Sequence, residues 1–429
     1  MVSFLFCLAL LTATALPGDP PVIHPTSRTR LAADSITVTF ADRKQYYTGG
    51  TAASRDSDVL SPKSVNIHPD GSKYYVNSLE GMRTVVFDFA TGRKLKVIHH
   101  RFDEQHLDLW APESGLFPFS YEYEHPETFS GKPVESTFSH NGRFLWVPYY
   151  RRSYDINAQD PSAMAVIDTE RDTIVRLFET GPLPKMVATS HDGTRIAVTH
   201  WGDNTVGLID ISGDDPVEWH YVNCYTVESK LKLEFSRTVQ VNRDANSGYC
   251  LRGTLFTKDD RYLLVGCMGS GGGIAVIDLQ NDRYLGRILG AKPNLRHLID
   301  SGDYLYASIN NKGFVQRIPL ERIYDAIGQL EAEDLSEVLV EGWESCKVPA
   351  GARTIVASPD GRFIFAACNY SSKIAVVDTR TMTLAGTLDA DSFPVGLDIS
   401  SDGQYLFSTS QARPVGGGNA VDIFRIEYR

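Results

Sequence analysis

Hydrophobic and polar residues alternate in short runs along most of the chain, and tight turns separate the runs. Residues 358–388 show the pattern clearly: they read SPDGRFIFAACNYSSKIAVVDTRTMTLAGTL. A period of two predicts β-strands with one face buried. Asp-Gly between two such runs predicts a hairpin, because the tight turn needs a positive φ that glycine adopts at little cost.

This turn-centred pattern occurs seven times. The copies are VNIHPDGSKYYVNS, STFSHNGRFLWVPY, VATSHDGTRIAVTH, TLFTKDDRYLLVGC, HLIDSGDYLYASIN, IVASPDGRFIFAAC and LDISSDGQYLFSTS. A third apolar run follows each hairpin, and a weaker fourth run usually follows that. Four short antiparallel strands in a unit of about 40 to 50 residues are typical of a β-propeller blade. The sequence therefore predicts an all-β, seven-bladed β-propeller, in which neighbouring sheets bury each other's faces.

The two ends of the repeat region predict how the ring closes. The last unit reaches only its third strand before Arg429, and residues 35–40, SITVTF, form a strand without a unit of its own. We expect this segment to supply the fourth strand of the last blade, since an unpaired sheet edge would otherwise remain. Residues 35–429 are thus predicted to form a single propeller domain, preceded by an extension at 16–34.

Insertions interrupt the repeat at 99–133, 149–162, 222–251 and 320–350. The first three, together with the loop at 410–419, are links between blades or loops between the second and third strands, which share one face of a propeller. Within the last insertion, residues 320–333 have the spacing of a helix and belong to the opposite face. Long loops gathered at one end of a rigid ring commonly bind a ligand, although they also serve to cap a channel or contact another subunit.

The repeat units carry a resemblance to a known family. The stretch at 358–388 and the stretch SHDGTRIAVTHWGDNTVGLID resemble the YVTN repeat, and residues 35–429 are similar to YncE-like seven-bladed propellers. The resemblance implies the propeller fold. It also implies several activities: exported binding proteins, surface-layer proteins, lactonase-like enzymes and electron-transfer dehydrogenase subunits.

The N-terminus, MVSFLFCLALLTATALPGDP, has an apolar core and a small-x-small motif at Ala13–Ala15. Both are typical of a secretory signal peptide, which we place at residues 1–15. The segment is too short to span a bilayer, and no later apolar run reaches about 18 residues. We therefore expect an extracytoplasmic protein, periplasmic or secreted, without a membrane span. In an oxidising compartment Cys224 and Cys250, which bracket one insertion, could form a disulfide.

Charge and motifs narrow the possible functions. The net charge is −11 with no basic tail, which argues against double-stranded nucleic acid as a partner. No CxxC, GxSxG, HExxH or phosphate-binding loop occurs, so no cofactor is expected. His99, His100, His106 and His125 lie in or beside the first insertion, but their spacing shows no convergence of ligands, and no metal site is predicted.

Basic residues recur where each blade enters its innermost strand. Counting back from the turns, the position after the strand start holds Lys63, Lys185, Arg252 and Arg353 in four blades, with Val134, Asn294 and Val395 in the others. Arg296 follows closely in blade five, and Glu135 in blade two. Cations that approach the axis from several blades would favour a carboxylate or phosphate, unless each of them pairs with an acid such as Glu135.

The loops on the same face add polar and aromatic candidates. Tyr150, Arg152 and Trp201 are predicted to line the rim of a ligand pocket together with the basic residues. If the protein is an enzyme, Tyr149 and His200 are the candidate proton-transfer groups. For His200, packing against a neighbouring blade is the alternative.

Three hypotheses follow. The first is an exported binding protein that recognises an acidic small molecule or carboxylated glycan. The second is an enzyme on the same face, either a uronate-directed lyase or a lactonase-like hydrolase. The third is a surface-layer or interaction scaffold that contacts a protein partner through its insertions. Residue spacing alone does not decide between them.

Overall fold

The computed structural model describes residues 30–33, 35–46, 55–232, 234–243, 245–333, 335–411 and 418–429. The predicted signal peptide lies outside these residues, and only residues 30–33 of the predicted extension fall within them. No helix in the described ranges is long and apolar enough to cross a membrane.

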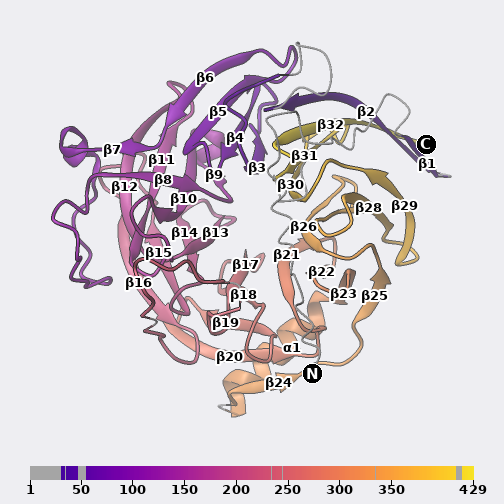
Figure 1. Cartoon of the computed structure of the whole chain (residues 1–429). Coiled ribbons are helices and arrows are strands. Elements are labelled where there is room, and N and C mark those ends of the chain that lie inside the picture. Colours follow the sequence, from indigo (N-terminus) through magenta and orange to yellow (C-terminus); the bar gives the residue numbers. More distant parts are fainter. Residues whose placement is uncertain are drawn as a thin grey trace, which may run out of the picture.

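Seven antiparallel sheets surround a central axis (Figure 1), which confirms the predicted seven-bladed β-propeller. Blades one, three and six have the basic four strands. These are β3 (Pro62–Ile67), β4 (Lys73–Ser78), β5 (Arg83–Asp88) and β6 (Lys94–His99); β13 (Pro184–Thr189), β14 (Arg195–His200), β15 (Thr205–Asp210) and β16 (His220–Thr226); and β26 (Ala352–Ala357), β27 (Phe363–Cys368), β28 (Lys373–Asp378) and β29 (Thr383–Asp389).

Blade two is widened by the first insertion. Its strands are β9 (Thr137–Ser139), β10 (Phe144–Arg152), β11 (Pro161–Asp168) and β12 (Thr173–Pro182), and the short 3₁₀ helix η3 (His140–Gly142) forms its first turn. The insertion adds β7 (Arg101–Phe102), the 3₁₀ helix η2 (Glu104–Leu109) and β8 (Phe129–Pro133), and β8 pairs with the end of β10.

Blades four and five are tied together by the segment predicted to be helical. Their strands are β17 (Leu251–Phe256), β18 (Tyr262–Cys267), β19 (Ile274–Asp278) and β20 (Arg283–Leu289); and β21 (Leu295–Ser301), β22 (Tyr304–Ile309), β23 (Phe314–Pro319) and β25 (Glu344–Lys347). The helix α1 (Leu320–Glu333) matches the predicted range and buries Ile323, Ala326 and Leu330. After it, β24 (Glu337–Leu339) pairs in parallel with β20, a connection that the sequence pattern did not predict.

Blade seven closes the ring with strands from both ends of the chain. It contains β30 (Pro394–Ile399), β31 (Tyr405–Ser410), β32 (Ala420–Tyr428), β2 (Ile36–Gln45) and β1 (Arg30–Ala33). The strand β2 lies beside β32 (Figure 1) and pairs with it along its length. The prediction that residues 35–40 complete the last blade is therefore confirmed, with β1 as an additional outer strand.

The hydrophobic core lies between blades, as the pattern of the repeat requires. Leu264 and Val276 of blade four pack with Leu305 and Ala307 of blade five, for example, and Ile323 of α1 covers their outer end. At the Asp-Gly turns, Gly71, Gly193, Gly361 and Gly403 all have a positive φ, between 69° and 73°. The seven sheets therefore form one rigid ring whose loops are fixed at its two faces.

The two faces differ in what they carry. We call the face with the links between blades and the second-to-third strand loops the loop-bearing face, and the other the plain face. The insertions at 99–133, 149–162 and 222–251 belong to the first, and α1 belongs to the second. Cys224 and Cys250 form no disulfide in the described part of the chain; Cys224 lies on β16, and Cys250 contacts the carbonyl of Ser247.

Candidate ligand-binding site

The basic residues of the predicted ring stand at β-bulges. The register between the first and second strands shifts at Lys63, Lys185 and Arg296, and within a two-residue stretch at Arg252 and Arg353. A bulge takes one residue out of the ladder and re-aims its side chain. Because the first strands line the axis, bulges at the same level in five blades direct five cations toward one region.

We call these five residues the cationic cluster: Lys63, Lys185, Arg252, Arg296 and Arg353. Five blades thus contribute a basic residue to the cluster. The sequence had placed basic residues at the equivalent position in only four blades. In blade five the bulge falls at Arg296, and Asn294 precedes the strand. The turn glycine of this blade stands at a different place in the hairpin. Counting back from it therefore pointed to Asn294 and not to Arg296.

Glu135, from blade two, is the acid to which the cluster is anchored. Its Oε1 lies 3.5 Å from Nζ of Lys63 and 4.0 Å from Nη2 of Arg353, and Nη2 of Arg252 donates a hydrogen bond to the same oxygen. Side chains from blades one, two, four and six therefore meet at one carboxylate. Both alternatives from the sequence hold together, since the cations converge and Glu135 pairs with three of them.

Trp201 forms the aromatic side of the cluster. Nζ of Lys185 lies 5.1 Å from the centre of the Trp201 ring and 4.2 Å from that of Tyr150. The guanidinium carbons of Arg252 and Arg296 lie 5.9 Å and 6.0 Å from the Trp201 ring. The predicted proximity of Tyr150 and Trp201 to the basic residues is thus present, with the rings in cation–π contact.

The electrostatics of the cluster show an excess of positive charge. Burial opposes ionisation of Glu135, yet Arg252, Lys63, Arg353 and Lys185 outweigh burial and hold the pKa of its carboxyl well below the usual range. Burial, followed by the charge of Arg353, lowers the pKa of the Lys63 ammonium well below its ordinary value. Burial and Arg252 likewise lower the pKa of His297 to about 4.

Two atoms of the central pair have hydrogen-bonding capacity to spare. Nη1 of Arg252 and Oε2 of Glu135 are buried and form no hydrogen bond within the described ranges. A buried polar atom without a partner costs free energy. The five cations are only 2% to 6% exposed, so the cluster is nearly closed to solvent.

A cleft opens beside the cluster on the loop-bearing face. It encloses about 970 Å³ between the insertions at 99–133 and 222–251. Its walls include Phe117, Phe119 and Phe235. Trp201 connects the two sites, since its Nε1 donates to the carbonyl of Arg243, which lines the cleft.

The cleft itself has no preference for an anion. Its lining holds four acids and four bases, namely Glu122, Asp160, Asp203, Glu234, Lys230, Lys232, Arg237 and Arg243. A smaller hollow of about 770 Å³ lies on the plain face beside Phe144 and Val217, and no predicted site residue lines it. Any preference for an acidic ligand therefore comes from the cationic cluster.

Arg152 has a different environment from the one predicted. Its Nη1 donates to the carbonyl of Pro126 at 2.6 Å, and its guanidinium stacks within 4.9 to 5.5 Å of the rings of Trp110, Tyr121 and Phe129. It holds the first insertion against blade two. No contact of Arg152 with the cationic cluster is present within the described residues.

Tyr149 and His200 are completely buried in their blades. The Tyr149 hydroxyl pairs with Nδ1 of His100 at 2.9 Å, and Nδ1 of His200 pairs with the Thr205 hydroxyl at 2.8 Å. Burial raises the pKa of Tyr149 and lowers that of His200 to about 3. Their catalytic role stays a prediction, and it would require the packed elements around both rings to open.

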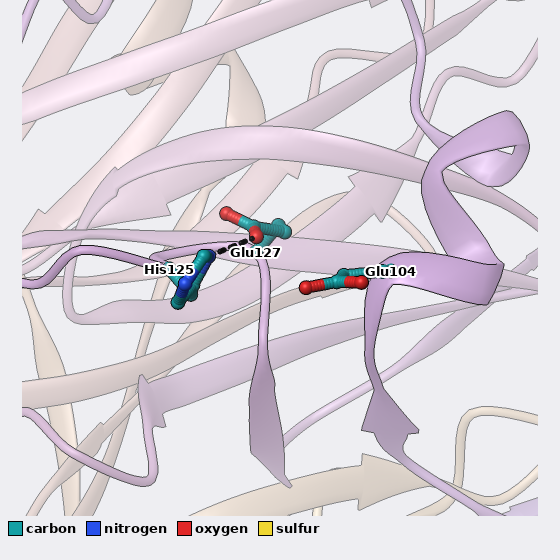
Figure 2. A group of neighbouring side chains, drawn as sticks. All are labelled: Glu104, His125 and Glu127. Atoms are coloured by element: carbon teal, nitrogen blue, oxygen red, sulfur yellow. Dashed lines mark hydrogen bonds and ion pairs between the residues drawn. The ribbon is translucent and has the colours of Figure 1, made fainter.

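The spacing of the histidines in the sequence did not reveal one group of possible metal ligands. Glu104, His125 and Glu127 each offer one donor atom, and these atoms lie within 4.8 Å of one another (Figure 2). His125 was considered in the sequence, but the two glutamates were not. The signal was hidden because the pairing of β7 with β8, which brings the two segments together, involves strands of only two and five residues.

Comparisons with known proteins support the fold and little more. No family model matches the chain, so the resemblance to YVTN-repeat propellers stays a prediction. Antigen Lp49 of Leptospira interrogans is 26% identical over 208 residues, which span 44% of this chain and 41% of the antigen. The structure of hydrazine synthase from Kuenenia stuttgartiensis superposes with a TM-score of 0.59 and 14% identity, covering 88% of this chain and 99% of that one. A likeness at this identity shows a shared fold, and the fold with its distant antigen relative fits a propeller binding protein.

Proposed function

We propose that this chain is an exported binding protein that recognises an acidic ligand, a carboxylated small molecule or the acidic terminus of a glycan, on its loop-bearing face. The observation that carries the proposal is the cationic cluster: basic residues from five blades converge, and four of them act on the carboxylate of Glu135. Packing like charges together in a buried site is unfavourable, so the arrangement is expected to be retained for what it binds.

The geometry suits a carboxylate in particular. Arg252 and Arg353 present planar donors, which match the two oxygens of a carboxylate. The unsatisfied Nη1 of Arg252 is a donor for such an oxygen. The Tyr150 ring lies at the same place, against Lys185, and is the aromatic side chain nearest to a sugar ring that would bear the acid.

Isothermal titration calorimetry with D-galacturonate, tri-galacturonate and citrate tests the proposal, with galactose as the uncharged control. We expect at least one acid to bind, galactose not to bind, and the affinity to fall as salt is raised. Arg296→Gln and Arg353→Gln should each weaken binding at least tenfold, because each removes a charge-assisted contact. Arg380→Gln is the matched control, since Arg380 is exposed in a turn of blade six.

Two results would overturn the proposal. One is the absence of binding by any of the acids at millimolar concentration, and the other is an unchanged affinity in both cluster variants. Absorbance of an unsaturated sugar product during the same incubations would instead favour the lyase alternative. Export is tested by mass spectrometry of the N-terminal peptide of protein recovered outside the cytoplasm. We expect cleavage after residue 15.

A further inference from the structure

The first insertion contains a cluster of donors that belongs to no site described so far. Glu104 begins η2, and His125 and Glu127 lie in the turn that precedes β8 (Figure 2). Nδ1 of His125 and Oε1 of Glu127 are 3.3 Å apart. Within the described part of the chain, the carboxylate of Glu104 has no ion pair or hydrogen bond of its own.

The β7–β8 ladder explains why two carboxylates meet here. The ladder ends at the pair Phe102 and Phe129, and the segments that leave it there bring the carboxylate of Glu104 within 4.8 Å of that of Glu127. Like charges this close repel each other. A cation between the two carboxylates would convert this repulsion into an attraction.

Hydrogen bonds fix the backbone of the turn that carries His125 and Glu127. The amide of Thr128 donates to the carbonyl of His125 at 3.0 Å, and Pro126 restricts the backbone between them. The carbonyl of Pro126 accepts hydrogen bonds from Arg152 at 2.6 Å and from the Tyr154 hydroxyl at 3.2 Å. The aromatic rings around Arg152 therefore fix the turn, which gives two of the three donors a defined position before any ion arrives.

We propose that Glu104, His125 and Glu127 bind one divalent transition-metal ion, with Zn²⁺ as the best fit. Zn²⁺ takes imidazole nitrogen and carboxylate oxygen at about 2.0 to 2.2 Å in a tetrahedral arrangement, which places neighbouring donors about 3.4 Å apart. The His125–Glu127 separation already has this value. An imidazole ligand disfavours Ca²⁺ and Mg²⁺, which prefer oxygen.

Three protein ligands leave a fourth position for water or for an external group. The ion would tie η2 to the turn before β8, two parts of the insertion that otherwise meet through a two-residue pairing. The same insertion supplies Phe117 and Phe119 to the wall of the cleft. The metal would thus stiffen one wall of the cleft, independently of what the cationic cluster binds.

Calorimetric titration of the untagged, EDTA-treated full chain with ZnCl₂ tests this site. We expect binding of one ion per chain and a rise in melting temperature with added Zn²⁺. Glu104→Gln and His125→Gln should each weaken the affinity at least tenfold and remove most of the thermal shift. Both side chains are exposed, so circular dichroism of the two variants should match that of the parent protein.

Matched controls separate this site from adventitious binding. Glu113→Gln removes another exposed glutamate of the same insertion, His220→Gln removes an exposed histidine elsewhere, and Cys224→Ser removes a partly accessible thiol. All three should leave Zn²⁺ binding unchanged. Absence of one-to-one binding, or an equal loss in the controls and the cluster variants, would refute the metal site.

Discussion

Glu135, toward the loop-bearing face, and Asp398, toward the plain face, are two carboxyl groups that behave in opposite ways. Near the loop-bearing face, cations lower the pKa of Glu135. Near the plain face, burial raises the pKa of Asp398 to about 7, because its carboxylate receives only the amides of Ile67 and Ile399. No Lys or Arg pairs with Asp398 within the described ranges.

Asp398 lies on the first strand of blade seven, and Glu135 lies just before the first strand of blade two, between β8 and β9. The bulges occur where the strands begin, and they direct basic side chains to that end of the channel only. The comparison shows that a propeller can build an asymmetric site from nearly equivalent blades, since one extra residue in each strand decides which end receives the charge.

The largest effect is expected from Glu135→Gln, which removes the charge that the cluster surrounds. Breaking a buried ion pair by neutralising one partner typically costs about 3–5 kcal/mol, since the remaining cations repel one another. Urea unfolding at pH 7 measures this loss. Glu122→Gln is the control, because Glu122 is exposed and pairs only at the surface with Arg237. A loss below about 1 kcal/mol for Glu135→Gln would show that the cluster is not electrostatically strained.

A smaller effect is expected at Val395, which stands at the corresponding bulge of blade seven and is 1% exposed. Val395→Glu and Val395→Gln have the same size, so their difference reports the local potential. We expect the Glu variant to be more stable than the Gln variant by about 2 kcal/mol at pH 7, because excess positive charge favours a carboxylate. If the Gln variant is the more stable, the cluster does not extend its field to blade seven.

An effect with a distinct pH dependence is expected from Asp398→Asn. Its folded pKa of about 7 lies above the ordinary value of 3.8, so the folded state binds more protons between these values. The stability that this group contributes is present at low pH and is lost as pH rises from about 4 through 7.

The stability of Asp398→Asn relative to the parent protein should therefore rise by about 4 kcal/mol between pH 4 and pH 8, since a pKa raised by about three units corresponds to about 1.4 kcal/mol per unit. Unfolding curves at both pH values measure the difference. A variant whose stability relative to the parent does not change with pH would mean that Asp398 ionises normally.

The repeat pattern was sufficient to predict the seven blades, the closing strand at 35–40 and the helix at 320–333. These features depend on local signals: alternation, Asp-Gly turns and helical spacing. The convergence of Lys63, Lys185, Arg252 and Arg353 was also foreseen, because the propeller geometry relates residues at the same level of each blade.

Contacts between distant segments could not be predicted from such local signals. Arg152 was predicted at the rim of the pocket, yet it ends β10 and three aromatic rings from the first insertion enclose it. Tyr149 and His200 are at strand ends in the sequence, and only the packing of neighbouring strands shows that they are buried. Glu104 and Glu127 are 23 positions apart and meet through a pairing too short to leave a periodic pattern.

The sequence by itself determined the ring, because alternation and turn chemistry act within a few residues of one another. The tertiary structure alone decided which charges share a pocket, since a single-residue shift in register re-aims a side chain without changing the hydrophobic pattern. Glu135 illustrates the division: its blade is evident from the repeat, while its place among three cations depends on bulges in three other blades.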